Sequence, residues 1–564
     1  MDIQRIAILV GLAVTSYLLV LAWNEDYGHQ VTDETIILTE DVPFIKDSQE
    51  DIPGIVIADD TNGVVAVDDI VPQMDEVIIA KVAATPSTIG HHIIVRTDVL
   101  DVTIDLNGGD IVRVALPAYP ANIDTPDIPF VLVDPRNSYS AQSGLIGPNG
   151  IDKSGNRPLY QSRLDRYELA DDDILIVNLT LPDDSNVQII KQFTFRRGDY
   201  LVDVKYIVRN QSHNDVSVAL FSQIKRDGQG PYNENTNSMG LRPFVGGATR
   251  TDDELYSKLN FDDIADEGYT GKLEGGYMAL VQHYFVSAWI PVGEGIFSYR
   301  ARKLKNQDIY LLGFTTPLMT ISPGTSGEIG AQYYAGPKDQ YRLEEIAAGL
   351  DLTVDYGFLW WLAQPLFYLL TLIHGVTNNW GVAIILLTVI VKTLLFPLSA
   401  ASFRSMAKMR KLQPEMARLK ERFGDDKQQF SQAMMELYKK EGANPLGGCF
   451  PILLQMPVFL ALYWTLMESV ELRQAPFFLW IYDLSVMDPY FVLPILMGAS
   501  MFLTQMMQPE PPDPTQAKVM KMMPIMFTFF FLWFPSGLVL YWLVNNILSV
   551  LQQWFVTRQV EKGS

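Results

Sequence analysis

The sequence predicts a mixed membrane protein with an α-helical polytopic core of six transmembrane helices, a large β-sheet domain outside the membrane, and a helical hairpin on the opposite side. First, 48% of the 564 residues are hydrophobic and 19% are charged, so the chain is too apolar for an ordinary soluble protein and too long for one domain. Second, residues 351–564 hold 16 Lys and Arg against 15 Asp and Glu, so the net charge of −22 comes from residues 1–350. Third, apolar runs of spanning length occur near the N-terminus and after residue 379, with short alternating runs between them.

Residues 1–24 are expected to form a transmembrane anchor. Residues 6–23 are an apolar run of about 18 residues, the length that crosses ~30 Å of hydrocarbon as a helix. A cleaved signal peptide is the alternative, but the run ends in Leu-Ala-Trp and offers no small-x-small cleavage site. We therefore expect the anchor to be retained.

Residues 25–80 are expected to form a flexible acidic tether. They hold 15 acidic residues and one basic residue, Lys46, with interspersed proline and glycine. Such a segment buries too little apolar surface to offset its conformational entropy. The acidic excess of residues 25–350 also argues against a DNA or RNA partner, because nucleic acid is itself polyanionic.

Residues 81–350 are expected to form a β-sandwich domain outside the membrane. Short alternating apolar runs are broken by turn residues such as Asn107-Gly108-Gly109, a spacing typical of antiparallel strands in a sandwich. The clearest runs are 102–106, 111–116, 174–179, 188–195, 201–208 and 216–224.

The sequence shows no catalytic or cofactor-binding motif. Cys449 is the only cysteine, which excludes an intrachain disulfide and a cysteine-based metal site. There is no Gly-x-x-x-x-Gly-Lys-Ser/Thr phosphate loop, no His-Glu-x-x-His and no Gly-x-Ser-x-Gly, and the six histidines are scattered. We expect no cofactor, no metal and no enzymatic activity.

Residues 351–379 are expected to form an amphipathic helix at the water–lipid boundary. They mix Trp360, Trp361, Tyr368 and His374 with leucine and isoleucine, a composition that suits the interface. Pro365 would also kink a helix that crossed the bilayer.

Residues 380–564 are expected to hold five transmembrane helices, at 380–401, 448–470, 490–507, 518–534 and 538–555. The connecting segment 402–443 carries ten Lys and Arg, whereas 471–489 carries only Arg473. The segment 402–443 is therefore expected on the cytoplasmic side. Six spans then place both termini in the cytoplasm and the β domain in the periplasm.

Residues 402–443 are expected to form a cytoplasmic helical hairpin. Apolar residues recur at steps of three or four up to residue 423, Gly424 ends this helix, and Asp425 with Gln428 resembles a capping box for a second one. The methionine-rich stripe either only holds the hairpin together or also receives varied apolar segments, while the basic face could meet anionic lipid or ribosomal RNA. The residues that would make these contacts are Met406, Met409, Arg410, Lys411, Met416, Met434 and Met435.

Lys392 is expected deep in the span that opens at Trp380, ~18 Å along the helix at 1.5 Å per residue. A cation at that depth costs at least a few kcal/mol unless water or a partner reaches it. Thr388 lies one turn earlier on the same face. The simpler interpretation is that the long stem of Lys392 carries its ammonium to the cytoplasmic surface.

Other spans also carry polar side chains at helical spacing. Several such faces indicate a shared, water-accessible groove, because polar groups would otherwise be unsatisfied in hydrocarbon; hydrogen bonding between helices is the alternative. The residues are Gln455, Ser500, Thr504, Tyr541, Asn545, Ser549 and Gln552.

A hydrated groove with one cation would suit a polypeptide that carries short acidic stretches into the bilayer, with partitioning of its apolar segment as the driving force. A secondary transporter or channel is the alternative function, although the sequence shows neither internal repeats nor broken helices. A sugar-modifying enzyme is a third possibility that would need an acid/base pair in one cleft.

Eight strings distributed over both parts of the chain resemble those of the YidC family of membrane protein insertases from Gram-negative bacteria, and the likeness covers nearly the whole chain beyond the tether. They are Leu116-Pro-Ala-Tyr-Pro120, Ala141-Gln-Ser-Gly-Leu145, Leu352-Thr-Val-Asp-Tyr-Gly357, Ser405-Met-Ala-Lys-Met409, Asn444-Pro-Leu-Gly-Gly-Cys-Phe-Pro451, Gln455-Met-Pro457, Val470-Glu-Leu-Arg-Gln-Ala-Pro476 and Phe534-Pro-Ser-Gly-Leu538.

This resemblance implies a periplasmic β-supersandwich of the galactose-mutarotase type and a five-helix insertase core in the inner membrane, with a groove open to the cytoplasm and the lipid. It implies action on nascent membrane proteins, alone or as a chaperone beside the Sec translocon and its accessory subunits, with the ribosome, the signal-recognition pathway and membrane lipids as further partners. The groove cation of the family is usually arginine, and Lys392 stands at the matching place; Thr388, Gln455, Tyr541 and Trp542 match groove-lining positions. Lysine keeps the charge but lacks the bidentate fork of arginine, and Trp542 stands where the family has tyrosine, so a hydroxyl contact is not expected there.

Overall fold

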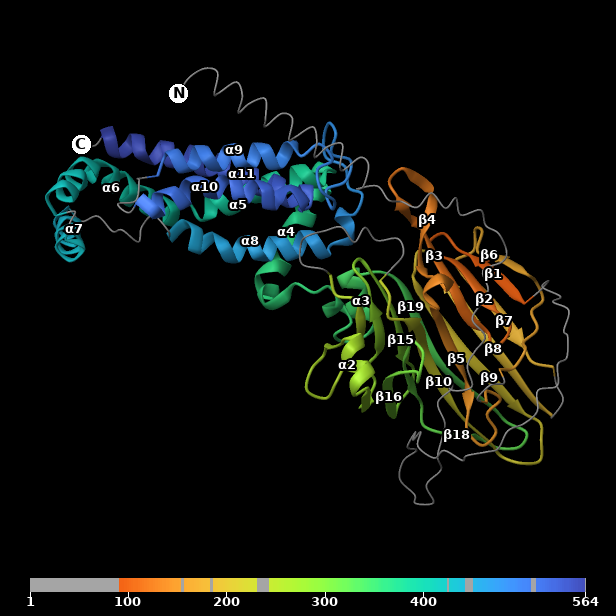
Figure 1. Cartoon of the computed structure of the whole chain (residues 1–564). Helices are drawn as coiled ribbons and strands as arrows, with labels where there is room; N and C mark the ends of the chain where they lie inside the picture. The colour runs from red at the N-terminus through yellow and green to blue at the C-terminus, as the bar shows by residue number, and fades with distance from the viewer. Residues whose placement is uncertain are drawn as a thin grey trace. The chain divides into compact units, whose positions relative to one another are not determined.

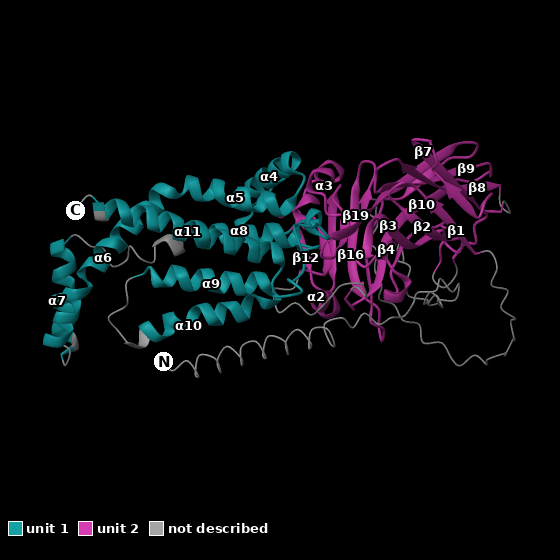
Figure 2. Ribbon diagram, turned by 90° about the horizontal axis from the view of Figure 1, so that it is seen from above, with its two compact units in different colours: residues 1–35, 236–242, 355–564 teal, residues 36–235, 243–354 magenta. Residues whose placement is uncertain are grey.

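The computed structural model describes residues 91–153, 157–182, 186–230, 243–423, 426–441, 450–508 and 514–562. The predicted anchor at 1–24 and tether at 25–80 lie outside these residues. The chain divides into two compact units, of which one contains the described residues up to 354 and the other those from 355 onward (Figure 2).

The first unit is sheet-rich, as predicted, and its larger sheet has 11 strands (Figure 1). All pairs are antiparallel except β1 with β6. In spatial order the strands are β13 (Tyr269–Glu274), β16 (Ile296–Lys303), β17 (Ile309–Thr315), β10 (Val216–Asp227), β5 (Ser140–Ile146), β3 (Asp110–Asn122), β2 (Asp101–Asp105), β1 (His92–Arg96) and β6 (Arg166–Glu168), with β18 (Met319–Ile321) beside β10 and β4 (Thr125–Val133) beside β3.

The second sheet has eight strands and packs face to face with the first. Trp289 on this sheet is buried and its Nε1 donates to Gln223 O on the larger sheet at 3.1 Å, so the two layers are in direct contact. The strands are β12 (Ser257–Leu259), β11 (Gly246–Thr249), β14 (Met278–Val281), β15 (Phe285–Pro291), β19 (Ser326–Pro337), β9 (Leu201–Asn210), β8 (Val187–Arg196) and β7 (Ile174–Thr180); the short helices are η1 (Pro135–Asn137), α2 (Phe261–Asp266), α3 (Gln340–Ile346) and η2 (Asp351–Thr353).

Strand β8 shows why the sequence forms a sandwich. Its alternate residues Ile189, Lys191, Phe193 and Phe195 are buried, while their neighbours are half-buried, which is the period of a strand with one face in a core. Three of the four are apolar. The fourth, Lys191, is the charged exception inside the sandwich.

Lys191 belongs to a buried group of charges that joins the two sheets. Its Nζ donates to Gly108 O at 3.0 Å and to Ser143 O at 3.1 Å and lies 4.0 Å from Asp110, while Arg157 bridges Asp110 at 2.5 Å and Asp152 at 3.1 Å. Burial lowers the pKa of Lys191 to about 7. Two acids and two bases compensate each other, as buried charges must.

Gly108 permits this arrangement, because its φ of 85° lies in the left-handed region and a Cβ there would overlap the Arg157 guanidinium.

The second unit is helical, as predicted for the C-terminal region. Its elements are η3 (Gly357–Leu359), α4 (Trp360–Thr377), α5 (Trp380–Leu394), α6 (Phe396–Phe423), α7 (Lys427–Glu441), α8 (Phe450–Glu468), η5 (Val470–Leu472), α9 (Val492–Met506), α10 (Pro514–Phe530), η6 (Phe531–Trp533) and α11 (Ser536–Lys562). Among the described residues, the segment Gly357–Thr377 is long and apolar enough to cross a membrane on its own, and α5 with α6 passes the same test as a bent pair.

The predicted helix at 380–401 is broken. It begins where Asn379 caps α5 by accepting from Val382 N at 3.0 Å, but it ends at Leu394, and α6 continues at an angle of 67°. Pro397, in the first turn of α6, has no backbone N–H to donate to Thr393 O, so the hydrogen-bond pattern of α5 cannot continue through it. Residues 396–401 therefore extend the first hairpin helix instead of the span.

Helix α4 lies across the end of α5 and α8 (Figure 1). Near its start, Ala363 O accepts from Thr465 Oγ1 at 3.5 Å; near its end, the His374 ring stacks on Trp380 at 3.9 Å. Thr465 is close to the end of α8 and Trp380 begins α5, so both contacts lie at one end of this antiparallel pair. The two α4 residues are ~16 Å apart along its axis, which requires α4 to cross the pair.

Helices α6 and α7 pack antiparallel, and Tyr438 OH donates to Met416 Sδ at 3.5 Å. The predicted cap Asp425 lies outside the described residues. Within them, Asp426 caps α7 by accepting from Gln428 N at 2.9 Å and Gln429 N at 3.1 Å.

Candidate functional site

Lys392 lies at the junction of α5, α8 and α11 and is only 7% exposed. Its Nζ donates to Gln455 Oε1 on α8 at 3.2 Å and to Ser549 Oγ on α11 at 2.8 Å. The residues occupy this position because α5 carries Lys392 near its end and α8 carries Gln455 near its beginning, so the antiparallel pair brings them to one level. The ammonium therefore points toward α8 and α11 within the helical unit.

The hydrogen bonds continue beyond Lys392. Gln455 Nε2 donates to Asn545 Oδ1, Ser549 Oγ donates to Asn545 O at 2.7 Å, and Gln552 Nε2 donates to Lys392 O at 3.2 Å. We call Lys392, Gln455, Asn545, Ser549 and Gln552 the polar cluster. It ties three helices together through side chains that the sequence pattern had assigned to one groove.

Thr388 lies outside these hydrogen bonds, whereas the side chain of Tyr541 forms a hydrogen bond with Gln455. Thr388 is buried and donates to Ile384 O of its own helix at 2.6 Å. Tyr541 is buried one turn before Asn545 and stacks on Phe459. Trp542 faces an aromatic group instead, with its ring 4.4 Å from Phe459 and 5.2 Å from Phe531.

A second polar contact joins α11 to α9. Asn546 Nδ2 donates to Ser500 Oγ at 3.1 Å, and Gln553 Nε2 donates to Met507 O at 3.1 Å. Ser500 is thus part of a different contact from Lys392, and Thr504 bonds only to Ser500 O on its own helix at 2.9 Å. Sequence reasoning missed Asn546 and Gln553, although their spacing of seven residues is itself a helical repeat.

The polar cluster, as defined above, contains a positively charged side chain and no negatively charged one. Within the described part of the chain, no carboxylate forms an ion pair with Lys392, whose two partners are a neutral amide and a neutral hydroxyl. The buried charge is hydrogen-bonded but not neutralised, in contrast to the balanced group around Lys191. Gln455, Ser549 and Gln552 are only half-buried, so one side of the polar cluster is accessible.

The hairpin residues predicted to meet clients divide into two groups. Met406, Met409 and Met416 are buried in a cluster with Tyr438, and Met434 packs against it. Met435 is 59% exposed, and Arg410 and Lys411 are exposed as well. The stripe therefore holds the hairpin together, and the exposed surface is formed by Met435 and the basic face.

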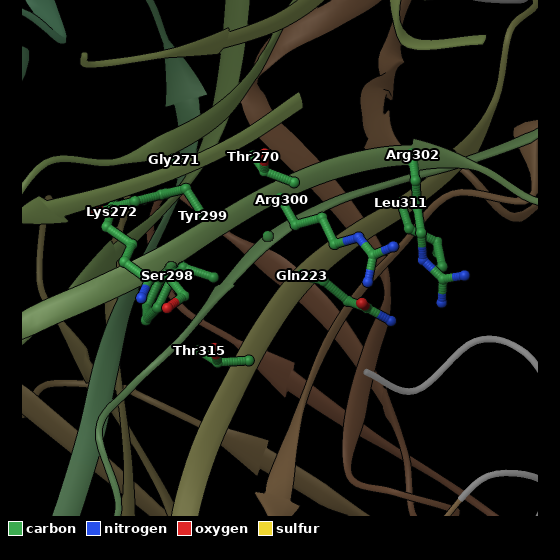
Figure 3. A pocket seen from close by; sticks show the side chains of 12 residues that line it. Gln223, Thr270, Gly271, Lys272, Ser298, Tyr299, Arg300, Arg302, Leu311 and Thr315 are labelled. Carbon is green, nitrogen blue, oxygen red and sulfur yellow. The ribbon is translucent and has the colours of Figure 1, made fainter. Parts of the chain in front are cut away.

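The β-sandwich unit has a separate depression of about 490 Å³ on the outer strands of its larger sheet (Figure 3). Lys272, Arg300 and Arg302 contribute to its lining, and Figure 3 shows the two arginines side by side above Gln223. No Asp, Glu or His is among the described residues that line it. The acid/base pair that a sugar-modifying enzyme would need is therefore not in this depression.

Taken together, a sheet-rich unit and a helical unit with an apolar exterior and a buried cation define the class of integral membrane proteins with a large extramembrane domain. Two family models match the chain: the YidC periplasmic domain over residues 92–369 and the 60Kd inner membrane protein over residues 372–563. The chain therefore belongs to the YidC family of membrane protein insertases.

Individual relatives agree with the family models. The membrane protein insertase YidC of Ectopseudomonas mendocina is 50% identical over 100% of this chain and 99% of its own length, and that of Stutzerimonas stutzeri is 51% identical over 100% of both. A crystal structure of an active YidC insertase covers 82% of this chain and 92% of its own, at 17% identity and a TM-score of 0.37. The relatives carry the name of an insertase and not of an enzyme, which confirms the expected absence of enzymatic activity.

Proposed function

We propose that this insertase receives the polar part of a client polypeptide at the polar cluster, with Lys392 as the group that attracts it. The observation that carries the proposal is a buried ammonium whose described partners are all neutral. A client carboxylate offers the opposite charge that the site lacks, and charge-assisted hydrogen bonds are stronger than those to neutral acceptors.

The polar cluster would work by exchange of hydrogen bonds. Gln455 and Ser549 satisfy Lys392 in the resting protein, and a client carboxylate replaces them as it enters from the accessible side. The released amide and hydroxyl can then bond to the client backbone, so neither of these two groups is left without a hydrogen bond during the exchange. Partitioning of the client's apolar segment into lipid supplies the driving force.

We further propose the predicted arrangement in the inner membrane, with six spans, both termini in the cytoplasm and the hairpin 402–443 on the cytoplasmic side. The ten basic residues of the hairpin support this orientation. The crossing of α4 over one end of α5 and α8 supports its assignment as an interfacial helix, although α4 is long and apolar enough to span.

The partners proposed for the chain are nascent membrane proteins, the Sec translocon with its accessory subunits, the ribosome, the signal-recognition pathway and lipids. The exposed basic face of the hairpin, including Arg410 and Lys411, suits polyanionic surfaces such as ribosomal RNA and anionic headgroups.

A photo-crosslinker on α11 tests the proposed entry site. Placed at Ser549, on the accessible side of the polar cluster, it should form adducts with a nascent single-span protein that carries an acidic tail. Placed at Ile547, which is 46% exposed on the same helix, it serves as the matched control. Adducts of equal yield at both positions, or at Ile547 alone, would show that clients pass elsewhere.

A further inference from the structure

The loop between α8 and α9 presents large apolar side chains outward. Leu479 is 80% exposed, Tyr482 65% and Phe478 57%. Residues 474–482 contain no charged side chain. We call residues 477–482 the apolar tip. An exposed group of this kind indicates a surface that is covered by something apolar.

The apolar tip is held in a fixed shape. Phe477 N donates to Ile481 O at 2.9 Å, and Leu484 N donates to Ala475 O at 3.0 Å, so the loop closes on itself. Leu479 has a φ of 59°, a left-handed conformation that leucine rarely adopts. The closed loop therefore holds Leu479 in its outward position.

The acids that follow the apolar tip are turned inward. Asp483 accepts from Ser485 N at 2.8 Å and from Ser485 Oγ at 2.7 Å. Asp488 is fully buried and accepts from Trp480 Nε1 at 2.9 Å. These two carboxylates are thus engaged within the loop, and the surface that carries Phe478 and Leu479 is formed by uncharged side chains.

The loop is fixed to the ends of the apolar helices. Asn379, which caps α5, donates to Phe477 O at 3.4 Å, and Ser536, the first residue of α11, donates from its backbone to Val486 O at 2.7 Å. Helix α4 crosses the same end and exposes Trp361 at 58% and Val376 at 80%. The apolar tip therefore lies at the end of the helical unit where α5 and α11 begin.

We propose that the apolar tip inserts into the periplasmic leaflet of the bilayer as a membrane anchor, with Phe478 and Leu479 below the headgroups and Tyr482 at their level. This placement follows the usual depth of aromatic and aliphatic side chains at the interface. It rests on the proposed orientation of the helices. Together with α4, the loop forms an apolar rim around the periplasmic end of the helical unit.

Site-directed spin labelling of the full chain in phospholipid vesicles tests this anchor. The sole cysteine is first replaced by Cys449→Ser, and one label is then attached at Leu479→Cys. Asn306→Cys, in an exposed turn of the β-sandwich unit with a similar φ of 61°, is the aqueous control; Ile525→Cys, 70% exposed on α10, is the lipid control. Accessibility to oxygen and to a water-soluble nickel chelate is measured at each site.

The label at 479 should match Ile525, with oxygen accessibility several-fold above that of Asn306 and the chelate excluded. If the label at 479 is as accessible to both reagents as the label at 306, the anchor is contradicted. If oxygen and the chelate are both excluded from the label at 479, the anchor is also contradicted, and the apolar tip is covered by protein instead. If Ile525 itself is aqueous, the proposed membrane span of α10 fails together with the anchor. In a second variant, Leu479→Asn, which tolerates the left-handed backbone, a label at Tyr482→Cys should become more accessible to the chelate; no change counts against insertion.

Discussion

Lys392 shows what a sequence pattern can and cannot decide about a single residue. Its polar neighbours on other helices could be proposed from spacing, and the structure brings Lys392, Gln455, Asn545 and Ser549 together. Spacing could not decide between a hydrated groove and direct hydrogen bonds, because it shows which residues share a helix face but not how far apart two faces lie. In the structure the side chains bond to one another.

The charge of Lys392 should matter for clients with acidic external tails. Lys392→Ala is expected to lower their insertion by roughly tenfold, as when a charge-assisted hydrogen bond of ~1.5 kcal/mol is lost. Lys392→Arg should retain insertion, because it keeps the charge. Protease protection of the client tail in proteoliposomes measures the effect.

A client with a neutral tail is the control for this series and should be much less affected by Lys392→Ala. Equal losses for acidic and neutral tails would mean that Lys392 supports the helices and does not attract carboxylates.

At the scale of elements, the break between α5 and α6 and the second polar contact of α11 were not predicted. The break could have been found from Pro397, but the apolar run continues through it, and hydropathy alone does not register a bend. Asn546 and Gln553 were missed because the stripe through Asn545 and Ser549 was taken as the polar face of α11. A helix that touches two neighbours has two such faces.

The contact between Asn546 and Ser500 should hold α9 against α11. Asn546→Leu is expected to lower the free energy of unfolding by roughly 0.5–1 kcal/mol, the usual worth of an interhelical hydrogen bond between membrane helices. Titration of the full chain in mixed detergent micelles with a denaturing detergent measures this change. In combination with Ser500→Ala the losses should not add.

The exposed neighbour Ile547 offers a matched control, since Ile547→Leu changes no hydrogen bond and should leave the unfolding free energy unaltered. Fully additive losses for Asn546→Leu and Ser500→Ala would contradict a direct contact.

At the scale of the whole molecule, the division into a sheet-rich and a helical unit was predictable because charge and periodicity change together near residue 350. The order of strands was not, since pairs such as β10 with β5 and β19 with β9 join segments far apart in the chain. The buried charges of Asp110, Arg157 and Lys191 were equally hidden. Each lies in a stretch of sequence whose pattern predicts an ordinary strand or turn.

The stability of the β-sandwich unit should depend on pH through Lys191. Its pKa in the folded unit is about 7, whereas the ordinary value of 10.5 applies to the unfolded chain. Between these values the unfolded chain binds more protons, so the free energy of unfolding should rise with pH, by at most about 1.4 kcal/mol per unit. Pulse proteolysis of the full chain in urea at pH 7 and pH 9 measures the slope.

Lys191→Met should reduce this slope, while Lys205→Met, which removes an exposed lysine paired with Glu328, should not. A slope unchanged in Lys191→Met would show that other groups govern the pH dependence.

The hydrogen bonds among Lys392, Gln455 and Ser549 have a consequence for the membrane potential. A protein that must pass polar chains through a bilayer risks letting protons and ions follow the same route and discharge the membrane potential. Lys392 is hydrogen-bonded to Gln455 and Ser549 in the resting protein, so a continuous file of water is not needed to solvate these three side chains. The fixed positive charge of Lys392 also repels cations at that point. If these three side chains receive a client as proposed, they would also limit the leakage of protons and ions while no client is bound.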